Sequence, residues 1–104
     1  VSGLVLATAD GAKARAIVAD LQRAALARLE TEATLGKEAI AKGGDQVMER
    51  HIIDVWGKWY VDALRTTAEI EVGGSSAQTR ATIDAAVKAV DERAKSLARG
   101  LTAE

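Results

Sequence analysis

A histidine and an aspartate stand one helical turn apart near the middle of the chain. An imidazole and a carboxylate at this spacing, His51 and Asp54, could share a proton in general base catalysis or supply two ligands to a metal ion. Neither use is complete, because His51 is the only histidine and the chain contains no cysteine. A di-iron site in a helix bundle would need Glu-x-x-His on two helices, and the sequence has no such motif. We therefore interpret the pair as part of a solvated surface and expect no enzyme, catalytic residue, metal site or cofactor.

All three aromatic side chains of the chain lie close together. Trp56, Trp59 and Tyr60 are the only aromatic residues. Such a cluster can fill a core, anchor a protein–protein interface, since Trp and Tyr are enriched at binding hot spots, or line a pocket for a small apolar molecule. Gly57, between the two tryptophans, would let another backbone come close. The sequence leaves all three uses of the cluster open.

The charge of the chain favours no particular class of partner. The 14 basic and 15 acidic residues give a net charge of −1, so no overall field attracts nucleic acid or an anionic membrane. No apolar run approaches the roughly 18 residues of a membrane span. We expect neither a nucleic-acid partner nor a membrane span. A chain without cysteine is compatible with several compartments, so the localisation stays open.

The composition is that of a helical protein. Proline is absent, aromatic residues make up 3% of the chain and alanine is abundant, which favours long helices over a sheet. Glycine pairs at 43–44 and 73–74 divide the chain into three segments of helical periodicity. We predict an all-α three-helix bundle with helices over residues 10–42, 45–72 and 76–99. These form a single domain of residues 10–104, preceded by an extended or flexible arm of residues 1–9.

Local signals refine these boundaries. Ser75 and Ser76 offer a hydroxyl cap for the third helix, with Gln78 completing a capping box. Gly100 can adopt the left-handed conformation that ends a helix. Gly36, inside the first helix, costs about 1 kcal/mol relative to alanine and predicts a bend or break there.

The first and third helices each carry one apolar stripe. In the third helix the stripe steps by three and four residues and consists of Ile83, Val87, Val90, Ala94, Leu97 and Leu101. The back of this helix carries small side chains, Ala81 and Ala85 among them, which would permit another helix to approach closely.

The second helix carries two apolar faces on opposite sides. One face contains the tryptophans and consists of Met48, Ile52, Val55, Trp56, Trp59, Ala63 and Ile70. The other consists of Ile53, Tyr60, Val61, Leu64, Ala68 and Val72. A single polar stripe runs along the helix and consists of His51, Asp54, Lys58, Asp62, Arg65 and Glu69. Such a helix needs cover on two sides.

One modest stripe from each flanking helix can cover only one of these faces. We expect both to pack on the face with the tryptophans, which leaves the opposite face to a partner. The predicted interface consists of Ile53, Tyr60, Val61, Leu64, Ala68, Val72, Ala81 and Ala85. The sequence thus predicts a non-enzymatic structural or adaptor protein that packs against copies of itself in a larger helical oligomer or against a helical partner. The alternative is a helical module that binds a small apolar molecule or lipid through Trp56, Trp59 and Tyr60.

Overall fold

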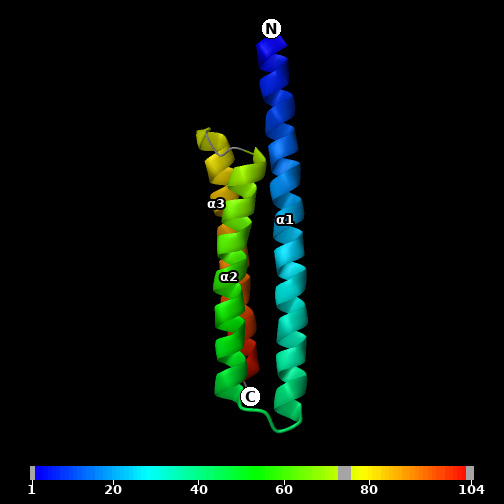
Figure 1. The fold of residues 1–104 in the computed structure, drawn as a ribbon, viewed down its shortest axis with the longest axis vertical. Helices are drawn as coiled ribbons and strands as arrows, with labels where there is room; N and C mark the ends of the chain where they lie inside the picture. Colours follow the sequence, from blue (N-terminus) through cyan, green and yellow to red (C-terminus); the bar gives the residue numbers. More distant parts are fainter. Residues whose placement is uncertain (1, 73–75, 103–104) are drawn as a thin grey trace.

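Three long helices pack side by side, each antiparallel to the next in sequence (Figure 1). The computed structural model describes residues 2–72 and 76–102, with side chains from 12 to 72 and from 76 to 101. Helix α1 spans Ser2–Ala41, α2 spans Gln46–Val72 and α3 spans Ala77–Thr102. Each helix contacts both of the others. The prediction of an all-α three-helix bundle is confirmed.

Helix α1 is much longer than its two neighbours. Its 40 residues correspond to about 60 Å of helix, against about 40 Å for the 27 residues of α2. The N-terminal turns of α1 consequently extend beyond the ends of α2 and α3 (Figure 1). The expected extended arm is wrong for residues 2–9, which belong to α1, while Val1 lies outside the described residues. The segment contains no proline, and a helix once begun gains a hydrogen bond for each residue added.

A tight turn joins α1 to α2 and satisfies the backbone groups at both helix ends. Gly43 has a φ of 99°, a left-handed conformation that glycine adopts without strain. Its amide donates to the Ile40 carbonyl at 2.9 Å, and the Gly44 amide donates to the Ala39 carbonyl at 2.8 Å. These are the two hydrogen bonds of a Schellman motif. Asp45 then caps α2, because its Oδ1 accepts a hydrogen bond from an amide of the first turn at 2.8 Å.

The first turn of α3 is capped by a serine hydroxyl. Ser76 Oγ accepts a hydrogen bond from the Thr79 amide at 3.0 Å and donates one to Thr79 Oγ1 at 2.8 Å. The predicted hydroxyl cap is therefore confirmed at Ser76. Thr79 occupies the position three residues after this cap, so Gln78 is not its capping-box partner, and Ser75 lies outside the described residues.

Two glycines that were expected to interrupt helices lie inside them. Helix α1 runs through Gly36 and α3 runs through Gly100 to Thr102, so the predicted break and the predicted helix end are wrong. Leu101 supplies the reason. It is 3% exposed, and its Cδ1 lies 3.4 Å from the place where a Cβ on Gly36 would be. Burying Leu101 against this glycine stabilises the last turn of α3.

The core lies between the three helices and is built from small and medium-sized aliphatic side chains. The predicted stripe of α3 is confirmed, with only Leu97 partly exposed. The most deeply buried large side chains are Leu29, Ile53, Ile83, Val18 and Val90. Among the side chains described, no polar or charged one is buried. The shape of the packed side chains therefore sets the positions of the helices.

Helices α2 and α3 come into close contact at Gly57. A Cβ placed on this glycine would lie 2.6 Å from the Cβ of Ala94, closer than two such carbons can approach. Gly57 is buried, and the element that comes close to it is α3, through the side chain of Ala94. The small residue on each helix allows the two to pack closely.

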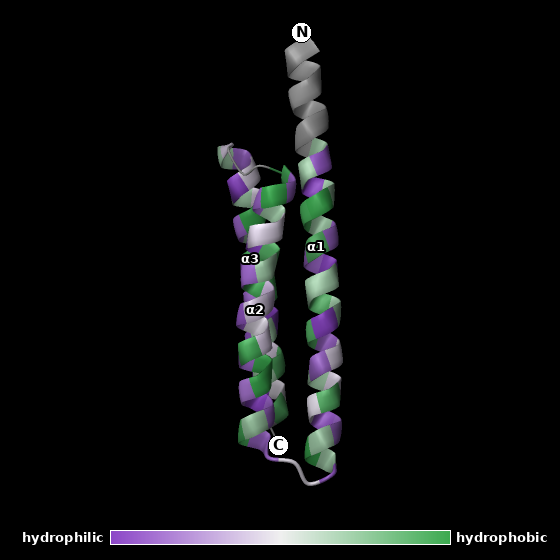
Figure 2. Ribbon diagram, in the orientation of Figure 1, coloured by the Kyte–Doolittle hydropathy of each residue, from purple (hydrophilic) through white to green (hydrophobic). Residues whose placement is uncertain are grey.

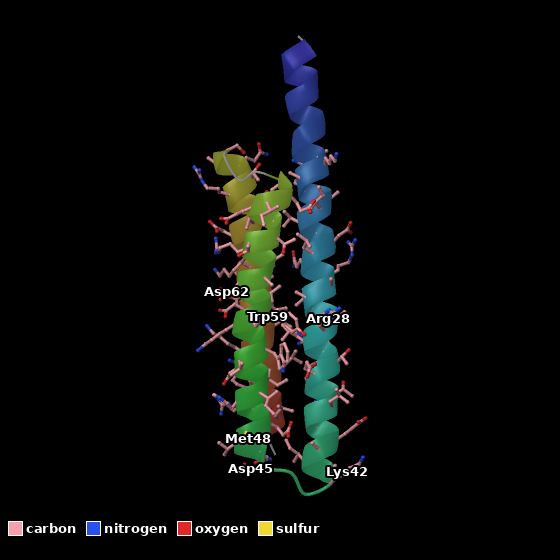
Figure 3. The ribbon with its side chains drawn as sticks, in the orientation of Figure 1. Arg28, Lys42, Asp45, Met48, Trp59 and Asp62 are labelled. Atoms are coloured by element: carbon pink, nitrogen blue, oxygen red, sulfur yellow. The ribbon has the colours of Figure 1, made fainter. Side chains whose placement is uncertain are left out.

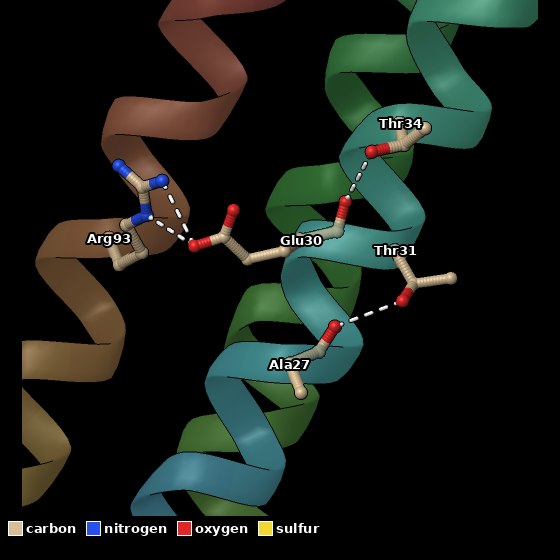
Figure 4. A network of polar contacts seen from close by, with 5 residues as sticks. All are labelled: Ala27, Glu30, Thr31, Thr34 and Arg93. Atoms are coloured by element: carbon tan, nitrogen blue, oxygen red, sulfur yellow. Dashed lines mark hydrogen bonds and ion pairs between the residues drawn. The ribbon is translucent and has the colours of Figure 1, made fainter.

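Ion pairs at the surface join α3 to each of its neighbours. Arg93 binds Glu30 of α1 through Nε at 3.2 Å and Nη2 at 3.0 Å (Figure 4). Arg65 of α2 binds Asp84 at 2.8 Å. The four side chains are between 44% and 62% exposed, so each pair contributes at most about 1 kcal/mol. Both pairs support an arrangement that apolar packing determines.

We expect Gly57→Ala to lower the free energy of unfolding by about 1–2 kcal/mol, because the cost of forcing α2 and α3 apart exceeds the gain in helix propensity. Urea unfolding followed by circular dichroism measures the change. The matched control is Gly100→Ala, which adds the same methyl group to another helical glycine. Outside the local helix backbone, nothing lies within 4 Å of the position of that added carbon. That variant should gain about 0.5–1 kcal/mol. Equal effects of the two substitutions would contradict the close contact.

Candidate functional site

The structure reverses the expected roles of the two apolar faces of α2. The face predicted to form an interface is enclosed by α1 and α3. Four of its residues are buried, at between 0% and 7% exposure, namely Ile53, Tyr60, Leu64 and Ala68. Two others are half-buried beside them, namely Val61 and Val72. The prediction that this face is left open is therefore wrong.

Side-chain size explains the reversal. The enclosed face has Gly57 near its centre and Ala68 near its end, so the neighbouring helices can come close to the backbone of α2. The opposite face carries Trp56 and Trp59, whose bulk would hold a helix away from the backbone. Apolar area alone would favour burial of the face with the tryptophans, because two indole rings have a large apolar area. Close packing decides in favour of the face with the small residues.

The face that contains the tryptophans is the one that stays open. We call its residues the tryptophan stripe, which consists of Met48, Ile52, Val55, Trp56, Trp59, Ala63 and Ile70. Ile70 is 77% exposed, Trp59 56%, Met48 55% and Val55 50%. Hydrophobic, neutral and hydrophilic segments alternate along α2 (Figure 2). Contiguous exposed apolar surface of this kind is common at interaction sites.

The three aromatic rings form one contiguous cluster. Trp56 stacks on Tyr60, with centroids 5.6 Å apart and ring planes at 24°. Trp59 meets both rings edge-on, at 5.8 Å from Trp56 and 5.2 Å from Tyr60. Stacked and edge-on contacts are the geometries that aromatic rings favour. Tyr60 is buried while both tryptophans are partly exposed, so the cluster reaches from the core to the surface.

An open groove lies between α1 and α2, over this cluster. Its volume is about 740 Å³, and it is open to solvent. The α2 wall consists of Val55, Trp56, Trp59, Tyr60, Ala63, Leu64 and Thr67, and the α1 wall of Leu21, Ala24, Ala25, Arg28 and Glu32. Trp59 and Arg28 lie at about the same level on the two sides (Figure 3). The groove is therefore a mostly apolar channel with one basic and one acidic side chain on its α1 wall.

The hydrophobic pattern predicts only part of the α1 wall, because Leu21 and Ala25 belong to the apolar side of the first helix while Ala24, Arg28 and Glu32 do not. Leu21, Ala24 and Arg28 are spaced by three and four residues and share one side of the helix. Arg28 and Glu32 are charged, so the wall as a whole does not appear as an apolar stripe in the sequence. The available signal is the short turn at 43–44, because two helices joined by a short loop run antiparallel. Residues equally distant from that turn must then lie side by side.

His51 and Asp54 are both exposed on α2. Within the described part of the chain, no hydrogen bond or ion pair joins them. No three histidine, aspartate or glutamate side chains described here come together as metal ligands would. None of the described helices has a stretch both long and apolar enough to cross a bilayer. The aromatic groove is thus the surface to which a function can be attached.

Ala81 and Ala85, the two remaining residues of the predicted interface, are exposed on α3. They lie outside the groove, whose walls belong to α1 and α2. Packing of another helix on this part of α3 stays a prediction.

The chain matches no protein-family model, no curated protein and no solved structure.

We expect Ile53→Ala to cost about 2–5 kcal/mol of stability, because it leaves a cavity in the core. Trp59→Ala should cost no more than about 1 kcal/mol, although it removes a larger side chain, since that side chain is more than half exposed. Urea unfolding at low protein concentration measures both values without a contribution from association. The opposite order would mean that the face with the tryptophans is the one enclosed.

Proposed function

We propose that this protein is a non-enzymatic structural or adaptor protein that packs, through the tryptophan stripe, against copies of itself or a helical partner. The supporting observation is the row of large apolar side chains along α2, in which Met48, Trp59 and Ile70 are each more than half exposed. The role predicted for the opposite face of α2 thereby moves to the face that the bundle leaves open.

The free energy available from covering the stripe is large enough to matter. Full burial of a large apolar side chain contributes about 1.5–3 kcal/mol, so the exposed parts of Met48, Val55, Trp59 and Ile70 together offer roughly 3.5–7 kcal/mol. Lost translation and rotation cost at least about 4 kcal/mol on association. A partner that covers a single side chain therefore gains too little. A partner that lies along the whole stripe and the α1 wall can offset the cost.

The shape of the groove favours a helix as the partner. The side-chain ridges of one helix pack into the grooves of another, and a channel between two antiparallel helices accepts such a ridge along its length. Ala24 on one wall and Ala63 on the other have small side chains, so the backbone of a partner helix can come near. Trp56 and Trp59 beside them are of the residue type most enriched at binding hot spots.

A helical module that binds a small apolar molecule or lipid is the second candidate. The groove volume of about 740 Å³ falls within the roughly 300–1,000 Å³ of ligand pockets, and three aromatic rings line it. Ligand pockets, however, bury about 70–90% of a ligand's surface, whereas this groove is open to solvent. Quenching of tryptophan fluorescence by an added fatty acid, at unchanged molecular mass, would favour this candidate.

We expect Trp59→Glu to weaken association by about tenfold or more while leaving the bundle folded. The substitution replaces an apolar anchor by a carboxylate that must lose its water on contact. Light scattering after size-exclusion chromatography, at tens of micromolar protein, measures the mass of wild type and variant. Circular dichroism confirms that the helix content is unchanged.

Ala85→Glu is the matched control, because it introduces the same charge at an exposed position of α3. Its mass should equal that of wild type. Dissociation by Ala85→Glu and not by Trp59→Glu would place the interface on the back of α3. A strictly monomeric wild type that binds no dye for exposed hydrophobic surface would contradict the proposed function.

A further inference from the structure

The charged side chains of the groove and the side chain of Tyr60 border two hollows at once. Arg28, Glu32 and Tyr60 line the groove, and they also line a second hollow of about 430 Å³ that lies beside it, mostly over α1. Because the same residues border both hollows, they lie where the two meet. An occupant that extends from the α2 wall across α1 therefore contacts all three side chains.

Tyr60 brings an unused hydroxyl to this place. Its side chain is 7% exposed, and within the part of the chain that the structure describes it forms no hydrogen bond. No polar side-chain atom described here is both buried and without a partner, so the hydroxyl still touches solvent, at the hollows that Tyr60 lines. A buried ring that ends in an accessible hydroxyl offers a hydrogen bond to whatever fills the groove.

Arg28 and Glu32 are also without a partner. They are four residues apart on one side of α1, but neither forms an ion pair or hydrogen bond with the other or with any other described residue. A pair at this spacing is favoured within a helix when the acidic residue precedes the basic one, and here the basic residue comes first. Both charges are therefore available to a molecule in the groove.

One carboxylate can bind both donors of the groove. Arg28 lies at the level of Trp59, the neighbour of Tyr60 in the chain (Figure 3), and the guanidinium and the hydroxyl both donate hydrogen bonds that a carboxylate accepts. Glu32 lies about 6 Å further along α1 and attracts a basic group. A fatty acid supplies only the negative charge, which Glu32 would repel. The groove therefore suits an occupant with an apolar body and two opposite charges one turn apart.

We propose that the groove binds an amphipathic helix of a partner protein, in which an acidic residue contacts Arg28 and Tyr60 and a basic residue four positions later contacts Glu32. This inference rests on the proposed function and specifies the chemistry of the partner. Two residues four apart on the partner helix are separated by the same rise as Arg28 and Glu32, so both contacts form together. The apolar stripe of the partner then faces Trp59 and the rest of the α2 wall.

The two charges also set the direction of the partner helix. The acidic residue precedes the basic one only when the partner runs in the same direction as α1, and so antiparallel to α2. In the opposite direction the same contacts need the basic residue first. The acid-first order is the better one because its own pair stabilises the partner helix.

Two synthetic peptides test the charges and their order. Each is a helix of about 20 residues with a leucine stripe, no aromatic side chain and one charged pair at the same edge of the stripe. The acid-first peptide carries Glu-x-x-x-Lys, and the base-first peptide carries Lys-x-x-x-Glu. The fluorescence of Trp56 and Trp59, which line the groove, reports binding. We expect wild type to bind the acid-first peptide about tenfold more tightly, because attractive contacts replace repulsive ones.

Three variants of the protein complete the test. Arg28→Glu combined with Glu32→Arg exchanges the charges of the α1 wall and should reverse the preference. Lys88→Glu combined with Glu92→Lys is the matched control, because it exchanges a pair of the same order and spacing on the exposed surface of α3, and it should leave the preference unchanged. Tyr60→Phe keeps the ring and should weaken the acid-first peptide by about fivefold, with little effect on the base-first peptide.

A preference for the acid-first peptide that reverses with the charges of α1 supports the inference. Equal binding of the two peptides overturns it and leaves a helical partner as the proposed function. Binding of neither peptide also overturns it, while the mass of the wild type and its binding of the dye still test the proposed function separately. A fatty acid that binds only when Arg28 is present, in a protein that binds neither peptide, would assign the groove to the second candidate.

Discussion

The contact between Gly57 and Ala94 fixes the rotation of α2 about its own axis. A Cβ on Gly57 would lie 2.6 Å from that of Ala94, so α3 can lie this close only where α2 has no side chain. Ile53 and Leu64 are then turned inward and buried. Helix α1 covers the remaining side of the core. The exposed tryptophans then lie at the edge of the core, beside α1. The absence of one methyl group at Gly57 thus favours the orientation in which the face with the tryptophans stays open to solvent.

Tyr60 connects the core to the surface that we propose for binding. Its ring is buried among the core residues and stacks on Trp56 at 5.6 Å, while Trp59 meets it edge-on at 5.2 Å. The two tryptophans are therefore held by a residue that the fold itself positions. Side chains that are already ordered lose less conformational entropy when a partner binds. The same packing that stabilises the bundle thus prepares its outer face for association.

Features that depend on residues near one another in sequence could be predicted. These include the three helices, the apolar stripe of α3, the cap at Ser76 and the presence of two apolar faces on α2. The choice between those faces could not, because it depends on Ala94, which belongs to another helix and is far away in sequence. The continuation of α3 through Gly100 depends in the same way on Gly36, against which Leu101 packs. Steric fit between distant residues leaves no trace in a hydrophobic pattern.

Both interhelical ion pairs described above involve α3. The ion pair Arg93–Glu30 joins α3 to α1, and Arg65–Asp84 joins α3 to α2, in addition to apolar packing. Helices α1 and α2 are connected by the turn at 43–44, and the groove lies between them. None of the four side chains in these ion pairs lines the groove, so substitutions on either groove wall leave both ion pairs untouched.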